Sequence, residues 1–128
     1  MIRPVFAISA LTLAVTSAAS ARCNGSSDCP IEIHMARGTD TIVLTGDTSK
    51  NPDCCDYVFR ARAGQKLFYW IDGANLRTVI VYPNGDADGP GLPNPIPLPQ
   101  SGRYRFGVHA HQMAEGGYGP FRLTLTIR

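Results

Sequence analysis

Apolar and polar residues alternate along most of the chain beyond residue 30. A period of two is typical of a β-strand, because successive side chains point to opposite faces. Segments that show this alternation or are rich in β-favouring residues lie at 31–35, 41–44, 57–61, 66–71, 78–82, 104–110 and 121–127. Turn-forming stretches separate them, and helical periodicity is absent outside the first 21 residues. The pattern predicts a single all-β domain, an antiparallel β-sandwich of seven or eight strands with a Greek-key or jelly-roll-like topology.

Residues 83–99 interrupt the alternation with six prolines and three glycines. Proline has no backbone N–H to donate, so such a segment does not fit inside a sheet. The composition predicts a long, semi-rigid surface loop, in which Ile96 and Leu98 form a short edge strand.

The first 21 residues have the composition of a secretory signal peptide. Arg3 supplies a positive charge, residues 5–15 are apolar, and Ala19-Ser20-Ala21 provides small residues before a cleavage site. The apolar run is too short to span a bilayer. We therefore expect residues 1–21 to be removed and residues 22–128 to form the domain in the periplasm or outside the cell, without membrane insertion.

Length and charge exclude several classes of function. The chain has 128 residues and a net charge of +2, with 12 Lys and Arg against 10 Asp and Glu. One small domain leaves no room for a separate cofactor domain, and we predict no cofactor. A nucleic-acid partner requires a basic stripe, which this sequence lacks. The oligomeric state stays open.

Four cysteines, Cys23, Cys29, Cys54 and Cys55, lie in the exported part of the chain. An even number in an oxidising compartment predicts disulfides. Three pairings are possible, and one of them joins the adjacent Cys54 and Cys55 in a small, strained ring. We therefore favour cross-links between the N-terminal arm (residues 22–30) and the 54–55 segment. The spacing matches no tetrahedral zinc site.

The segment Ser101-Gly102-Arg103-Tyr104 lies at a turn that leads into a strand. Tyr104 has the place of a tyrosine corner, in which the hydroxyl bonds to the backbone a few residues upstream. The same turn also has the form of a rigid protrusion that recognises a partner through Ser101, Gly102 and Tyr104. The two interpretations are compatible.

Three stretches resemble a known family: Tyr57-Val58-Phe59-Arg60-Ala61-Arg62-Ala63-Gly64-Gln65-Lys66, the Thr-Val-Ile-Val-Tyr-Pro-Asn-Gly strand and turn at 78–85, and Leu98-Pro99-Gln100-Ser101-Gly102-Arg103-Tyr104. From about residue 40 onward the chain is similar to bacterial periplasmic inhibitors of g-type lysozyme and, more loosely, to pre-peptidase C-terminal β-sandwich domains. The resemblance implies that the Ser-Gly-x-Tyr turn enters a lysozyme cleft, with Ser101 and Tyr104 at the contact. This chain differs by its cysteine-bearing arm, and its 111–117 loop lacks the Lys and Arg residues expected to grip an acidic cleft.

His109-x-His111-x-Met113 is a second constellation, in which the three side chains share the strand face opposite Tyr104. Imidazole and thioether ligands suit copper, and His34-Met35 offers a fourth ligand. The alternative is a solvated strand face.

Catalysis has little support in the sequence. Ser101 has no identifiable His and Asp partners. The carboxylate pairs Asp53/Asp56 and Asp86/Asp88 lie in turns, where Asp mainly bonds its own backbone. We therefore predict that the protein is not an enzyme.

Three functions follow from these features. The first is an exported protein-binding inhibitor of a lysozyme-type muramidase that acts through the Ser-Gly-x-Tyr turn. The second is a generic β-sandwich module for carbohydrate or cell-envelope partners, and the third is a periplasmic copper- or zinc-binding protein. Stacking platforms for the second are Trp70, Tyr69, Tyr82 and Tyr118, unless these aromatic residues are buried.

Overall fold

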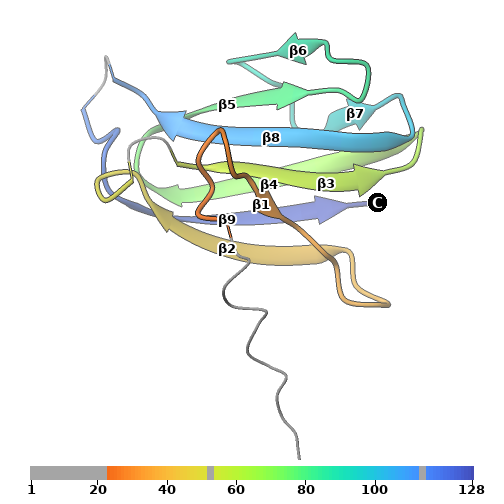
Figure 1. Ribbon diagram of the computed structural model, residues 1–128, viewed down its shortest axis with the longest axis horizontal. Coiled ribbons are helices and arrows are strands. Elements are labelled where there is room, and N and C mark those ends of the chain that lie inside the picture. Colours follow the sequence, from red (N-terminus) through yellow and green to blue (C-terminus); the bar gives the residue numbers. More distant parts are fainter. Residues whose placement is uncertain (1–22, 52–53, 113–114) are drawn as a thin grey trace, which may run out of the picture.

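The computed structural model describes residues 23–51, 54–112 and 115–128, and in these residues all regular structure is β. Nine strands are formed within them (Figure 1). They are β1 (Ile31–Glu32), β2 (Thr41–Asp47), β3 (Asp56–Ala61), β4 (Gln65–Gly73), β5 (Leu76–Val81), β6 (Ala87–Asp88), β7 (Ile96–Leu98), β8 (Gly102–Ala110) and β9 (Pro120–Ile127).

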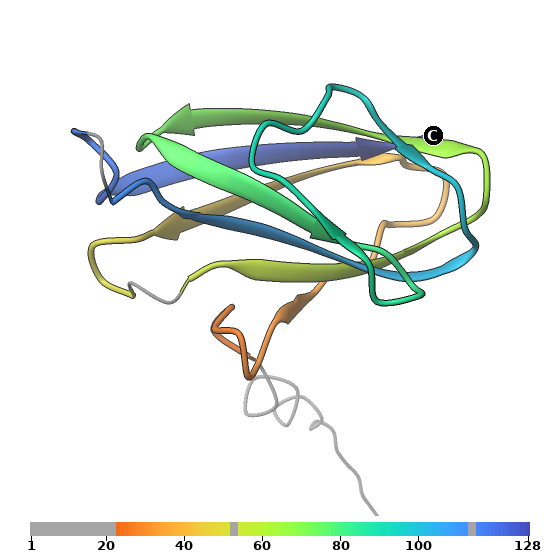
Figure 2. The ribbon, with the colours of Figure 1, turned by 90° about the horizontal axis from the view of Figure 1, so that it is seen from above.

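The strands form two sheets. The first has the order β1-β3-β8-β5-β6 and the second the order β2-β9-β4-β7. Every pair is antiparallel except β1 with β3. Figure 2 shows the N-terminal arm on the outside of β3. The predicted all-β sandwich is confirmed.

The alternating apolar residues meet between the two sheets. The first sheet contributes buried side chains that include Tyr57, Phe59, Tyr104, Phe106 and Ile80, and the second contributes Leu67, Ile96, Leu98, Leu123 and Leu125. Phe59 and Tyr104, directly opposite each other in the β3–β8 register, stack with their ring centroids 5.5 Å apart. Removing this apolar area from water provides the main driving force for folding.

The Pro-rich segment differs in part from its predicted form. Ile96–Leu98 is an edge strand, as predicted, and it pairs with β4. The additional strand β6 was not predicted. It arises because the Tyr82 N–H donates to the Asp86 carbonyl (2.8 Å) and the Gly85 N–H donates to the Tyr82 carbonyl (2.9 Å), a tight turn that returns the chain alongside β5.

The first predicted strand is also changed. Only Ile31 and Glu32 of the 31–35 segment form β1, and they pair with β3 in the parallel direction. One further hydrogen bond, from the Ile33 N–H to the Val58 carbonyl (2.8 Å), continues the contact. The arm therefore lies along β3 as a short edge.

The predicted cross-links between the arm and the 54–55 segment are wrong. The structure pairs Cys23 with Cys29 and Cys54 with Cys55. The Cys29 N–H donates to the Ser26 carbonyl (3.0 Å), and this turn brings the Cα atoms of Cys23 and Cys29 to 5.0 Å. That separation is within the range of a disulfide, so the arm closes on itself.

The predicted signal peptide, residues 1–21, lies outside the described residues. Within the described part of the chain, no helix has the length and apolar character needed to cross a membrane.

Candidate functional site

Three turns meet at one end of the sandwich, where β3 ends and β8 begins (right in Figure 1). They are the β3–β4 turn at 62–64, the β5–β6 turn at 82–86 and the β7–β8 turn at 99–101. Two hydrogen bonds connect the β7–β8 turn to the other two: Asn84 N–H to Gln100 Oε1 (3.1 Å) and Ala63 N–H to Ser101 Oγ (2.9 Å). A third joins the Gly64 N–H to the carbonyl of Leu98, the last residue of β7 (2.9 Å). The β7–β8 turn is thus held from both sides.

Tyr104 anchors this turn from below. Its hydroxyl donates to the Gln100 carbonyl (2.7 Å) and accepts from the Gln100 N–H (3.0 Å). Its side chain is 0% exposed, and its ring makes an edge contact with Tyr82 at 5.8 Å. The tyrosine-corner interpretation is confirmed. Tyr104 lies beneath the turn, fully buried and with its hydroxyl occupied, which favours a positioning role over direct contact with a partner.

Gly102 and Ser101 form the surface of the turn. Gly102 has a φ of +145°, and a Cβ at this position would lie 3.0 Å from Pro83 Cβ. Only glycine combines that φ with so close a neighbour. Ser101 is exposed. Because Ser101 Oγ accepts from Ala63, its own O–H remains available to donate outward.

A hollow of about 490 Å³ opens beside Ser101 and Gly102. Its other lining residues are Met35, Thr39, Asp40, Arg60, Ala61, Arg62, Gln65 and Ile127. A second hollow of about 280 Å³ shares Met35, Arg60 and Ile127 with it and continues past Glu32 and Arg103. The two hollows thus share part of their lining along the end of β3, and together they form the depression beside the turn.

Basic side chains border this depression. Arg60 lies opposite Arg103 in the β3–β8 register, and Arg62 follows in the adjoining turn. Arg103 forms an ion pair with Glu32 (3.4 Å). Within the described residues, Arg60 and Arg62 are exposed and form no ion pair. The turn is thus flanked by two exposed positive charges.

Arg60 and Arg62 were not predicted as site residues. Basic residues were expected instead in the 111–117 loop, which follows β8 at the opposite end of that strand. The alternation in β3 does contain a signal, because buried Phe59 and Ala61 leave Arg60 and Arg62 for the other face. Their position beside Ser101 depends on the pairing of β3 with β8, which the local pattern does not specify.

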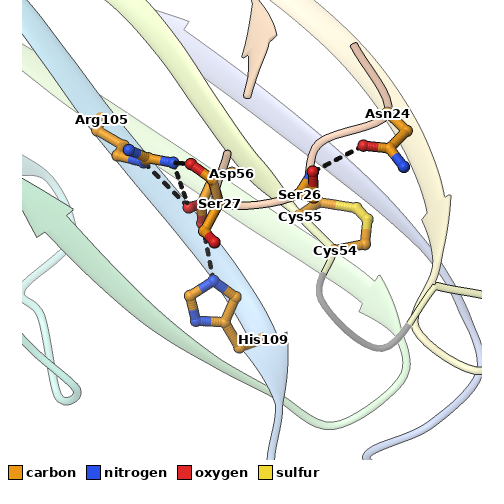
Figure 3. A network of polar contacts seen from close by, with 8 residues as sticks. All are labelled: Asn24, Ser26, Ser27, Cys54, Cys55, Asp56, Arg105 and His109. Carbon is orange, nitrogen blue, oxygen red and sulfur yellow. Dashed lines mark hydrogen bonds and ion pairs between the residues drawn. A yellow bond between two sulfur atoms is a disulfide. The ribbon is translucent and has the colours of Figure 1, made fainter. Parts of the chain in front are cut away.

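Asp56 forms a second polar cluster, which holds the arm against the first sheet (Figure 3). Its carboxylate lies 2.7 Å from His109 Nε2 and accepts from Arg105 Nε at 3.0 Å. Arg105 also donates to the Ser27 carbonyl, and the Asp56 N–H donates to the Gly25 carbonyl (2.7 Å). Burial favours a higher pKa for Asp56, but His109 and Arg105 outweigh it and hold the pKa below its usual value.

The arrangement around Asp56 does not support the predicted copper or zinc site. His109 is engaged with Asp56, and Met113 lies outside the described residues. His111 is partly buried just beyond the end of β8. Across residues 23–51, 54–112 and 115–128, no three His, Cys, Asp or Glu side chains are grouped so that they could hold a metal ion.

The carboxylates considered for catalysis also have structural roles where they are described. Asp86 accepts from the Asn84 side-chain amide (3.1 Å), and Asp88 accepts from the Gly89 N–H (2.9 Å). Asp53 lies outside the described residues.

The four candidate stacking residues divide into two groups. Tyr69 and Tyr82 are partly buried, Tyr69 against Phe106 with ring centroids 5.4 Å apart. Trp70 is 67% exposed and Tyr118 is 52% exposed.

Solved structures share this architecture. Salmonella Typhimurium PliG, a periplasmic inhibitor of g-type lysozyme, superposes with a TM-score of 0.61 at 22% identity, over 77% of this chain and 97% of that chain. Aeromonas hydrophila PliG gives 0.60 at 23% identity (77% and 96%), and a mutant of Escherichia coli PliG gives 0.61 at 21% identity (76% and 96%). No protein-family model and no curated protein sequence matches the chain. At the level of fold, the resemblance to the periplasmic inhibitors of g-type lysozyme is confirmed.

Proposed function

We propose that this chain is an exported inhibitor of g-type lysozyme, which acts in the periplasm or outside the cell by binding the enzyme rather than by catalysis. The observation that carries the proposal is the shared sandwich, which spans nearly the whole length of the three PliG chains. The braced turn with its exposed hydroxyl and flanking arginines supports it. Residues 1–21 serve as the export signal in this proposal.

Ser101 and Gly102 are the proposed point of contact. The β7–β8 turn is already ordered by its bonds to Ala63, Asn84 and Tyr104. Little conformational entropy is lost when such a preorganised turn binds a cleft. Tyr104 acts as a positioning residue, because it holds the turn but does not reach the surface.

Arg60 and Arg62 extend the proposed contact. Glycosidase clefts contain catalytic carboxylates, and an exposed guanidinium complements a carboxylate in charge and geometry. Unpaired cations around the turn also accelerate encounter with an acidic cleft, and this acceleration weakens as salt is added. The positive charge that the 111–117 loop lacks is thus supplied by β3 and its turn.

The proposal is tested with variants of the contact. Ser101→Ala removes a hydroxyl that donates to a charged acceptor, and we expect about 10- to 150-fold weaker inhibition, from roughly 1.5 to 3 kcal/mol. The double variant Arg60→Gln/Arg62→Gln is expected to inhibit at least about tenfold less well and to lose salt dependence.

Arg122→Gln is the matched control, since Arg122 is also an exposed arginine but lies on β9 of the other sheet. It is expected to inhibit like the wild type. If the double variant and Arg122→Gln inhibit equally well, or if Ser101→Ala inhibits as strongly as the wild type, the contact lies elsewhere.

A further inference from the structure

The outer face of the second sheet carries the single tryptophan of the chain. Trp70 lies on β4 and is 67% exposed. In the strand register, Trp70 is opposite Thr124 of β9, which in turn is opposite Val43 of β2. Val43 is 55% exposed, so this row of side chains faces solvent. The proposed inhibitory turn does not include any of these residues.

A shallow groove of about 250 Å³ runs beside the indole. It is lined by Phe68, Tyr69, Trp70, Asn94, Thr124 and Thr126. Its lining thus combines aromatic rings with two hydroxyls and one carboxamide. None of the lining residues is charged, and the neighbouring Arg128 guanidinium lies over the Phe68 ring.

The rim of this groove is fixed in place. The Asn94 side chain donates to the Tyr69 carbonyl (2.7 Å) and accepts from the Tyr69 N–H (3.3 Å), so it pairs with β4 in the manner of a strand. The Tyr69 hydroxyl donates to the Leu92 carbonyl (2.9 Å). The Pro-rich segment is therefore anchored to β4, and the groove is formed before any ligand arrives.

The extent of the apolar surface argues against a protein partner. A tryptophan contributes about 150–250 Å² of contact area, whereas a standard protein interface needs about 800 Å² on each partner. Around Trp70 the exposed apolar side chains are few, and the guanidinium of Arg128 lies over the Phe68 ring at 5.4 Å. A second copy of this chain would find too little apolar area here for a stable dimer.

We infer that this face binds an uncharged glycan chain through stacking of a pyranose ring on Trp70. A pyranose with equatorial substituents offers an apolar C–H face of about the size of the indole and a periphery of hydroxyls. Thr124, Thr126 and Asn94 line the groove beside the indole and offer polar atoms to that periphery. The Asn94 carboxamide keeps one N–H beyond its two bonds to Tyr69. The Thr126 hydroxyl also contacts Thr41 Oγ1 (2.9 Å). This site is independent of the proposed inhibition.

The test uses the hexasaccharide of β-1,4-linked N-acetylglucosamine with the purified protein. Trp70 is the only tryptophan, so fluorescence excited selectively in the indole reports on this face alone. We expect a saturable blue shift of the emission and protection of the indole from acrylamide quenching. Calorimetry with Trp70→Ala is expected to show binding at least about tenfold weaker, whereas Tyr118→Ala, which removes another exposed aromatic ring, is expected to bind like the wild type.

Two results would overturn the inference. One is an emission spectrum unchanged at millimolar hexasaccharide, and the other is a blue shift that depends on protein concentration without any glycan, which would indicate a second copy on this face. Lysozyme inhibition is measured on the same samples. We expect Trp70→Ala to inhibit normally, so failure of glycan binding and failure of inhibition are told apart.

Discussion

Replacement of Tyr104 by Phe removes one oxygen atom from the base of the proposed contact turn. That oxygen makes two hydrogen bonds with the backbone of Gln100, at 2.7 and 3.0 Å. Gln100 is partly exposed, so water replaces part of what is lost. We therefore expect the free energy of unfolding to fall by about 1–2 kcal/mol, the lower part of the range for leaving a buried polar group without its hydrogen-bond partner. For a domain of this size, that corresponds to a fall in Tm of about 4 °C or more.

Tyr57→Phe is the matched control in the same core. Tyr57 is as fully buried as Tyr104, but its hydroxyl has no hydrogen-bond partner among the described residues, and burial raises its pKa. Removing this hydroxyl is expected to leave the stability unchanged or raise it by up to about 1 kcal/mol. Thermal unfolding followed by circular dichroism compares the two. The assignment of Tyr104 as the structural anchor would be refuted if Tyr104→Phe melted at the same temperature as the wild type and Tyr57→Phe melted at a lower one.

Three further predictions concern the charge cluster, the turn and the disulfides. The folded-state pKa of Asp56 lies below its unfolded value, so its contribution to stability is present above about pH 4 and is lost as the pH falls further. In urea unfolding between pH 7 and pH 2.5, the free energy of unfolding should therefore fall less at acid pH for Asp56→Asn than for the wild type. The same pH dependence in both proteins would contradict this. Gly102→Ala should cost about 1–3 kcal/mol, because alanine strongly disfavours a φ of +145°, and an unchanged Tm would show that the turn adapts. Non-reducing peptide mapping should link Cys23 to Cys29 and Cys54 to Cys55; a peptide that joins the arm to residues 54–55 would contradict the structure.

The sequence predicted those parts of the fold that depend on local alternation. The long strands were predictable because apolar residues recur at every second position, as at Tyr104, Phe106 and Val108, and all three are buried. The tyrosine corner was predictable from residue type and place. By contrast, Ala87 and Asp88 are both exposed and show no alternation, so β6 has no signature in the sequence.

Features that depend on contacts between distant residues were not predictable in the same way. The parallel direction of β1 follows from the path of the arm along β3. The pairing of Cys23 with Cys29 depends on the backbone turn at Ser26, which the cysteine spacing alone does not reveal. Arg60 approaches Ser101 only because β3 pairs with β8, and Asp56 meets His109 across the same pair of strands. A pattern along one strand does not contain its register with another.

The most direct test of the proposed function is titration of lysozymes of the g, c and i types with the purified wild-type protein, in an assay that measures lysis of bacterial cells. We predict inhibition of the g-type enzyme at submicromolar concentration, in keeping with the tight binding reached by preorganised inhibitor turns. Full activity of the g-type enzyme at micromolar concentrations of the protein would contradict the proposal.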